Sequence, residues 1–326
     1  MGKGKSLTGK LCSAYKDFQT DLEWSFSYAS TRLLLKGCKA LHLSGAEKRL
    51  EQKRDRFILD YLRDLLQPVF EGYAADQDMG EYVPNAPIWV CWWTGMETAP
   101  DLVKRCVESI RKNACGHPVH VITRDNVSQY IQIPEFLMRK VENGDVCLAN
   151  FTDYLRVKLI ATYGGLWLDA TIFCTGPIPP AFFDNPIYTM KGGPNADAFL
   201  SRCRWTGFCL GGWKGNLFYR MLVSTFERYW QNNQHAITYL FFDYLILLLC
   251  EKVPVIGERM EAIPPNNTRR DDLQVAMAEN RSTAEAHKVI CEDTVLYKLS
   301  WKGNYETVAA DGSPSLYGAL LLGTLA

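Results

Sequence analysis

The sequence predicts an α/β fold in which helices flank a central sheet, preceded by a helical extension. Two observations support this prediction. Residues 84–126 place an amphipathic helix between two short apolar runs, which is the pattern of a βαβ unit. Residues 1–80, 217–233 and 236–253 instead carry patterns typical of helices. With 326 residues, the chain is long enough for one large domain or two small ones.

The helical extension is predicted over residues 1–80, and the domain that carries the chemistry over residues 81–326. Helical spacing is clearest over residues 46–70, where Pro68 is expected to close the helix. Residues 1–56 hold 12 Lys or Arg against 6 Asp or Glu, although the whole chain has 36 of each. A solvated helical face explains this local excess, and contact with an anionic membrane surface is the alternative.

The βαβ unit begins at IWVCWW, residues 88–93, which is wholly apolar and rich in β-forming residues, as expected for a strand buried on both faces. A helix follows over residues 99–114, and then a second strand, PVHVITRDN. Such a crossover joins parallel strands, and ligands in open α/β sheets bind beyond the carboxyl ends of the strands. The first strand therefore places Trp92, Trp93 and Thr94 at a binding mouth.

The later elements carry weaker signals, and the region from about residue 256 is poorly defined. The expected elements are a helix at 133–144, short strands near 185–190 and 207–216, helices at 217–233 and 236–253, loops from 256, and a last strand at 293–303.

Composition restricts the setting and the partners. The net charge is zero, which argues against a nucleic-acid partner. The start of the chain shows no signal peptide, and the longest apolar run, residues 237–250, is too short to cross a bilayer. Eleven cysteines form no Cys-x-x-Cys pair, which favours free thiols in a reducing cytosol. The sequence therefore predicts a cytoplasmic protein, with peripheral membrane contact as the alternative.

Residues 152–171, TDYLRVKLIATYGGLWLDAT, begin as a helix. Thr152 is expected to cap a helix that starts at Asp153. Asp153 and Arg156 are three positions apart, so they share one helix face near the N-terminus. An ordinary ion pair between them is the simpler interpretation.

The same segment then turns at two glycines and becomes a strand that ends in an acid. Gly164 suits a left-handed helix cap, and Gly165 allows a sharp turn into the strand LWLDATIF. Asp169 on an otherwise apolar strand is costly unless it is paired or coordinates a cation. A diphosphate bound through Mg²⁺ or Mn²⁺ would suit this position, because these ions share protein carboxylates with phosphate oxygens.

Three blocks of the sequence, in order, resemble a known family. IWVCWWTG, APDLVKRCVESI and FTDYLRVKLIATYGGLWLDAT are similar to the bacterial capsular polysaccharide synthesis proteins, glycosyltransferases with a sugar-binding region of the Asp-x-Asp type. The resemblance is good over residues 84–180 and fair to about residue 250. It implies a GT-A fold, with a Rossmann-like mixed sheet that binds a nucleotide-diphosphate sugar.

The resemblance also assigns roles to single residues. Asp153 and Arg156 match the residues that hold the hydroxyls of the donor sugar. Asp169 matches the first acid of the Asp-x-Asp motif, so it is predicted to be catalytic and to bind the metal. Trp92 or Trp93, with Thr94, falls where relatives contact the nucleobase.

The match has one departure, at Thr171. The wider group has a second aspartate there, whereas Thr171 offers a neutral hydroxyl to the metal. A metal ion, Mn²⁺ or Mg²⁺, is still expected at Asp169 and Thr171, together with the diphosphate. Lys298 and Lys302 are candidates to contact that diphosphate, because basic groups stabilise a phosphate leaving group. A pair of solvated lysines is the alternative.

These observations predict a glycosyltransferase in the synthesis of capsular or other cell-surface polysaccharide. It would move a sugar from a nucleotide-diphosphate donor to a hydroxyl of a glycan or lipid-linked glycan acceptor. The resemblance implies retention of the anomeric configuration. The alternatives are a sugar-nucleotide hydrolase and a non-catalytic carbohydrate-binding subunit.

Overall fold

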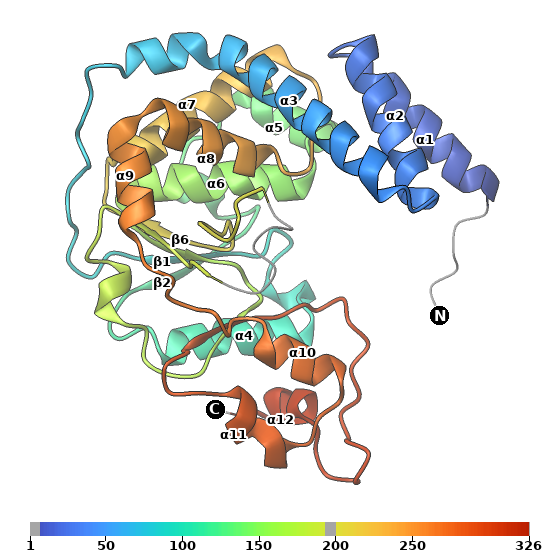
Figure 1. Ribbon diagram of the computed structural model, residues 1–326. Coiled ribbons are helices and arrows are strands. Elements are labelled where there is room, and N and C mark those ends of the chain that lie inside the picture. The colour runs from blue at the N-terminus through green and yellow to red at the C-terminus, as the bar shows by residue number, and fades with distance from the viewer. Residues whose placement is uncertain (1–6, 193–199, 326) are drawn as a thin grey trace.

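The computed structural model describes residues 7–192 and 200–325. Across these residues the central sheet has five strands in the order β2-β1-β3-β6-β5 (Figure 1). Strand β1 is parallel to both β2 and β3, whereas β6 is antiparallel to β3 and β5. The predicted α/β class, with a mixed sheet and flanking helices, is therefore confirmed. The bounds of the strands are β1 (Ile88–Cys91), β2 (Val119–Ile122), β3 (Gly165–Leu168), β5 (Ile187–Thr189) and β6 (Cys209–Gly212).

Helices cover both faces of this sheet (Figure 1). One face carries α5 (Glu135–Asn143), α6 (Leu148–Tyr163), α7 (Leu217–Asn232) and α8 (Phe241–Lys252), and the opposite face carries α4 (Asp101–Lys112). Side chains alternate along each strand, so neighbouring residues join different cores. Trp89 and Trp167 join the core on the α6–α7 side, whereas Val90, Leu166 and Leu168 join the core that contains α4. Wholly apolar strands are needed because both faces are covered.

The strand that was expected to run through LWLDATIF is broken at Asp169, so this prediction was wrong. Strand β3 ends at Leu168, and β4 (Ile172–Cys174) belongs to a second sheet, in which it pairs antiparallel with β7 (Leu296–Lys298). The chain turns between the two strands, where the backbone N–H of Ile172 donates to the carbonyl of Asp169. In the β4–β7 register Ile172 lies opposite Lys298. The break therefore brings residues near the C-terminus to the end of β3.

The N-terminal helices are α1 (Leu7–Asp21), α2 (Phe26–Ala40) and α3 (Ser44–Gly72). Buried Ile58, Leu62 and Leu66 of α3 belong to the same core as α7 and α8, so the extension shares the core of the α/β domain. Pro68 lies inside α3 and does not end it, contrary to the prediction. Proline removes one backbone donor, and here the helix continues for four residues beyond it.

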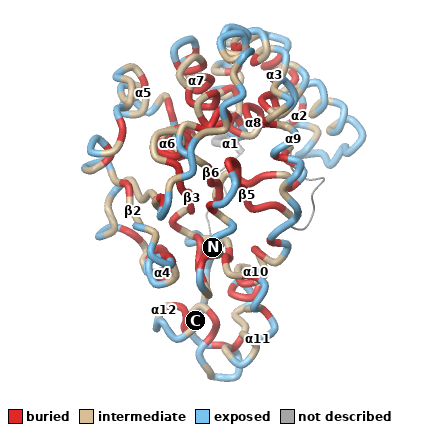
Figure 2. The backbone as a smooth tube through the Cα atoms, turned by 90° about the vertical axis from the view of Figure 1, so that its left-hand side faces the viewer, coloured by how far each residue is buried: buried red, intermediate tan, exposed pale blue. Residues whose placement is uncertain are grey.

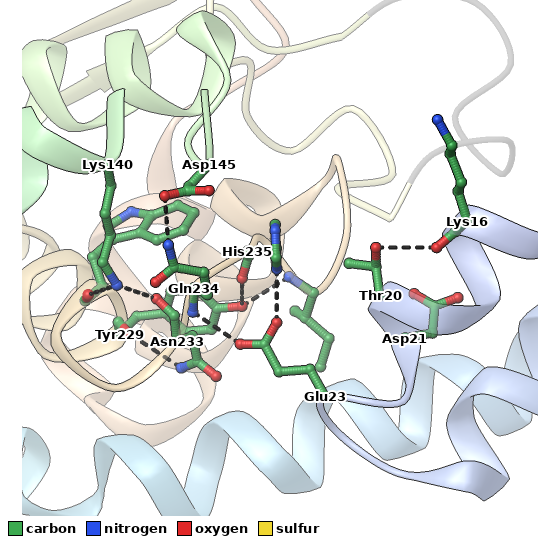
Figure 3. A network of polar contacts seen from close by, with 12 residues as sticks. Lys16, Thr20, Asp21, Glu23, Lys140, Asp145, Tyr229, Asn233, Gln234 and His235 are labelled. Atoms are coloured by element: carbon green, nitrogen blue, oxygen red, sulfur yellow. Dashed lines mark hydrogen bonds and ion pairs between the residues drawn. The ribbon is translucent and has the colours of Figure 1, made fainter. Parts of the chain in front are cut away.

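A polar network fastens the turn between α1 and α2 to the loop after α7 (Figure 3). The carboxylate of Glu23 accepts from the backbone N–H of Gln234 at 2.8 Å and contacts Nδ1 of His235 at 2.9 Å. Lys140 of α5 donates to the carbonyl of Asn233 at 2.6 Å. In addition, the hydroxyl of Tyr28 donates to the carbonyl of Ile237 at 2.5 Å. These contacts fix how α2 lies against the domain.

The C-terminal region contains several helices where only loops were expected, so that prediction was wrong. These are α9 (Pro254–Ala262), α10 (Asp272–Ala278), α11 (Ala286–Val289) and α12 (Leu316–Leu322). A single turn of 3₁₀ helix, Thr283–Glu285, directly precedes α11. Similar turns occur earlier in the chain at Met96–Thr98, Val127–Gln129 and Pro180–Phe182. Leu273, Tyr297 and Leu316 form a core with Leu102 of α4. Elements of four to nine residues show too few turns for a helical period to stand out.

Candidate active site

Helix α6 begins earlier than predicted. Its first residue is Leu148 and its cap is Cys147, so Thr152 is not the cap; the Thr152 hydroxyl donates instead to the carbonyl of Ala149 at 2.8 Å. Nothing in the residues before Asp153 breaks a helix, and Phe151 gains a buried position by joining it. Asp153 and Arg156 therefore lie in the second and third turns of α6, away from its N-terminus.

Two glycines turn the chain from α6 into β3. Gly164 has φ 73° and ψ −166°, which is outside the predicted left-handed cap conformation and is accessible mainly to glycine. Gly165 has φ 99°, and a Cβ there would lie 2.0 Å from the carbonyl oxygen of Pro87. This close approach lets β3 pair with β1. The turn therefore places the end of β3 beside α6.

Asp169, directly after β3, is surrounded by hydrogen-bond donors. Its Oδ1 accepts from Nε1 of Trp167 at 3.0 Å and from Nη2 of Arg156 at 3.2 Å. Its Oδ2 accepts from Nζ of Lys298 at 2.8 Å. Burial alone would raise the pKa of Asp169, but the charges of Lys298 and Arg156 and the hydrogen bonds from Lys298 and Trp167 lower it to about 2. Asp169 is therefore an anion at any physiological pH.

Arg156 joins the two acids that the sequence singled out. Nη1 contacts Oδ1 of Asp153 at 2.5 Å, while Nη2 reaches Asp169. The guanidinium lies over the rings of Trp167 and Phe242, with its carbon 5.1 and 5.5 Å from their centroids. Its Nε is buried and has no hydrogen-bond partner within the described ranges. An unsatisfied buried donor of this kind is costly to the folded state.

The pKa values of Asp153 and Asp243 are raised, whereas that of Asp169 is lowered. Burial raises the pKa of Asp153 to about 7; Arg156 opposes this effect, whereas the charges of Asp169 and Asp243 add to it. Burial also raises the pKa of Asp243, which accepts from Nε1 of Trp205 at 2.9 Å. Asp153 is thus poised to hold a proton near neutral pH, and burial shifts the pKa of Asp243 in the same direction.

These groups open into one cavity of about 850 Å³, a size that accommodates a drug-sized ligand. It lies between the ends of β1, β3 and β7 and the helices α6 and α8. Every residue predicted for the site lines it: Trp92, Trp93, Thr94, Asp153, Arg156, Asp169, Thr171, Lys298 and Lys302. Their roles in binding and catalysis stay predictions.

The predicted nucleobase residues differ in what they contact. Trp93 packs edge-on against Phe151, with ring centroids 5.0 Å apart, which ties it to the core. Trp92 meets Trp301 edge-on at 6.1 Å, and its buried Nε1 has no hydrogen-bond partner among residues 7–192 and 200–325. Thr94 is exposed and shares a hydrogen bond with Thr98 at 2.7 Å. Both tryptophans are half-buried and line the cavity, and contact of either with a nucleobase stays a prediction.

Lys298 lies between the two residues predicted to bind a metal. Its Nζ is 2.8 Å from Oδ2 of Asp169 and 2.8 Å from Oγ1 of Thr171. In the part of the chain that the structure describes, no group of three or more His, Cys, Asp or Glu side chains is arranged to hold a metal ion. Asp169 and Thr171 thus share the ammonium group of Lys298 as a common partner, and their role as metal ligands stays a prediction. Lys302 is exposed and lies over the ring of Trp301 at 5.5 Å.

Several aromatic residues of the site were not identified from the sequence. Trp167 and Phe242 enclose Arg156, and Phe208 lies under Lys298, with Nζ 5.0 Å from its ring centroid. Trp301 lies between the candidate residues Lys298 and Lys302 in the sequence, so its position could have indicated a place in the site. Phe208 and Phe242 carry no such signal, because both sit in runs that resemble ordinary core segments.

Ligands of open α/β sheets bind beyond the carboxyl ends of the strands, and the cavity lies beyond those ends of β1 and β3. The chain belongs to the capsular polysaccharide synthesis protein family, whose model matches residues 39–320. It is also similar to the O-glycosyltransferase braB of Annulohypoxylon truncatum, with 24% identity over 162 residues. That match covers 44% of this chain and only 37% of the relative, so the chain spans little more than a third of that protein. No solved structure matches the chain.

Proposed function

We propose that the protein is a glycosyltransferase that moves a sugar from a nucleotide-diphosphate sugar to a hydroxyl of a glycan acceptor. One observation carries the proposal. A single cavity holds the Asp153–Arg156 pair, the permanently charged Asp169 and the cation of Lys298. Family membership and the likeness to a protein named as an O-glycosyltransferase support the same reaction class.

In this proposal the chain's own cations receive the departing diphosphate. The bond between the anomeric carbon and the diphosphate oxygen breaks, and a bond to the acceptor oxygen forms. The acceptor hydroxyl gives up its proton to the departing diphosphate, so charge balances. Lys298 and Lys302 stabilise the negative charge that develops on the departing diphosphate. Oriented cations in a cavity with little water stabilise such a charge strongly. A divalent ion, when bound, would supply the same positive charge.

We assign the donor sugar to Asp153 and Arg156. A carboxylate accepts hydrogen bonds from sugar hydroxyls, and the unpartnered Nε of Arg156 can donate one. Asp169 orients Arg156 and Lys298 by binding both. Neither oxygen of Asp169 is without a donor, so it is poorly placed to attack the anomeric carbon. This arrangement fits retention without a covalent intermediate on Asp169.

We assign the acceptor to the open rim of the cavity. Tyr239, Leu240, Leu148 and Trp301 line the cavity and are exposed. Aromatic and apolar side chains at a rim suit the apolar faces of sugar rings. A glycan, free or linked to a lipid, fits this chemistry. Synthesis of capsular or other cell-surface polysaccharide in the cytoplasm is the setting we propose.

Donor turnover with and without acceptor tests this function. A panel of nucleotide-diphosphate sugars should release nucleotide diphosphate faster when acceptor glycans are present, and the sugar should appear on the acceptor. Equal release with water alone would identify a sugar-nucleotide hydrolase. Binding of glycans without turnover of any donor would identify a non-catalytic carbohydrate-binding protein.

A further inference from the structure

Helix α2 has two apolar faces. Tyr28 and Leu35 point into the protein and are almost fully buried. Phe26, Leu33 and Leu34 lie on the opposite side, at positions i, i+7 and i+8 of the helix, and Leu41 follows one turn after Gly37. Their exposed fractions are 72%, 43%, 60% and 70% in chain order. We call Phe26, Leu33, Leu34 and Leu41 the α2 apolar stripe.

The stripe cannot turn inward, because the other side of α2 is fixed. The Tyr28 hydroxyl is bonded to the carbonyl of Ile237, and its ring stacks on Phe57 of α3 at 4.8 Å. Arg32 is paired with buried Asp21 at the end of α1. Figure 1 shows α1 and α2 at the edge of the molecule, and in Figure 2 the backbone beside the α2 label is mostly pale blue, which marks exposed residues. The stripe is therefore a stable feature of the surface.

Exposed basic side chains lie on α1 and α3, the two helices that pack against α2. Lys16 of α1 and both Lys48 and Arg49 at the start of α3 are exposed, and none has an ion pair with another described residue. The acids of these helices are engaged instead by Lys36, which pairs with Asp17, and by Lys39, which pairs with Glu51. Residues 1–56 carry 12 Lys or Arg against 6 Asp or Glu, which leaves 24 against 30 in the remainder.

We propose that the α2 apolar stripe, together with the exposed basic side chains of α1 and α3, docks on an anionic lipid bilayer. An amphipathic helix of this kind lies in the interface, with its apolar side chains among the acyl chains and its lysines at the headgroups. Leu22 and Leu43, both exposed at the two ends of α2, extend the same surface.

A second copy of the chain is a poorer occupant of this surface. Two copies of this surface would bring like charges together, because residues 1–56 carry 12 Lys or Arg against 6 Asp or Glu. The bilayer satisfies both the apolar and the basic parts of the surface.

Co-sedimentation with vesicles tests the proposal independently of any transferase activity. The protein should bind phosphatidylcholine vesicles that contain phosphatidylglycerol, less well without it, and less well in high salt. The triple variant Leu33→Ser/Leu34→Ser/Leu41→Ser should bind at least about tenfold more weakly. The matched control Val275→Ser/Val308→Ser removes exposed apolar side chains far from α2 and should bind as the unmodified protein does.

Three results would overturn the proposal. These are no binding to anionic vesicles, equal binding by the triple variant, and a dimer in sedimentation velocity that the triple variant abolishes. If the triple variant does not fold, Lys48→Ser/Arg49→Ser gives the same test through charge, with weaker binding expected only on vesicles that contain phosphatidylglycerol.

Discussion

Asp169 organises the cavity because it holds Arg156 and Lys298 at once. Each cation lowers the pKa of Asp169, and the carboxylate in turn fixes where each cation lies. The sequence motif identified Asp153, Arg156 and Asp169 correctly as neighbours, since a helix face and a strand end are local features. It did not identify Trp167 or Phe242, whose contacts with Arg156 depend on the tertiary fold.

Arg156→Lys tests whether this side chain contacts the donor sugar. A lysine cannot reproduce the planar fork that contacts Asp153 and Asp169 together. Affinity for a sugar nucleotide should fall about tenfold or more, and affinity for the free nucleotide should fall less. Calorimetric titration of both ligands measures this difference, with exposed Arg139→Lys as the control. Equal losses for both ligands would indicate a nucleotide contact or general destabilisation.

Lys298→Met tests whether the ammonium group of Lys298, in place of a metal ion, stabilises the departing diphosphate. The unmodified protein should keep most of its turnover in a chelator such as EDTA, because Lys298 lies between Asp169 and Thr171. Lys298→Met should lose at least about 100-fold in kcat, and exposed Lys302→Met much less. Turnover that stops in chelator and returns with Mn²⁺ would restore the metal to the mechanism.

Asp153 gives the stability of the protein a defined pH dependence. Its pKa rises from 3.8 to about 7 on folding, so the folded state holds this proton more tightly than the unfolded chain. Between about pH 4 and 7 the unfolded chain releases the proton first, and the free energy of unfolding therefore falls as pH rises. Asp153→Asn does not titrate, so urea unfolding should show a smaller fall over this range. Parallel curves for the two proteins would contradict the assigned environment.

At the scale of elements, the turn between α6 and β3 determines the geometry of the site. It was predicted from Gly164 and Gly165, because glycine is the residue that such backbone angles require. The break after β3 was not predicted, since LWLDATIF is apolar on both sides of Asp169. Only the pairing of β4 with β7 reveals it, and that pairing joins segments more than 120 residues apart.

Gly165→Ala tests the importance of this turn. Its new Cβ would meet the carbonyl oxygen of Pro87 at 2.0 Å, and φ is 99°, so the backbone must shift. The free energy of unfolding should fall by at least about 2 kcal/mol, with loss of turnover. Gly45→Ala in α3 has open space around its Cβ and should be neutral or slightly stabilising. Chemical denaturation of both variants measures the difference, and equal stabilities would show that the close approach is unimportant.

At the scale of the molecule, the α/β class followed from the βαβ pattern of residues 84–126, and the mixed sheet was implied by the family resemblance. The C-terminal helices were not predicted, because each is short and depends on tertiary packing. Helices α10, α11 and α12 pack with α4 and β7, whereas α9 joins the core that contains α7 and α8. The link between α3 and the α/β core also depends on long-range packing that the local pattern does not reveal. No helix within residues 7–192 and 200–325 has the length and hydropathy needed to cross a membrane.

The most direct test of the central claim compares turnover by the unmodified protein and by Asp169→Asn. The sugar nucleotide that the unmodified protein uses fastest should be turned over at least about 100-fold more slowly by the variant, because Arg156 and Lys298 lose their common partner. A thermal midpoint close to that of the unmodified protein would show that the fold is intact. Near-normal turnover by Asp169→Asn, or no turnover of any nucleotide-diphosphate sugar by the unmodified protein, would contradict the claim.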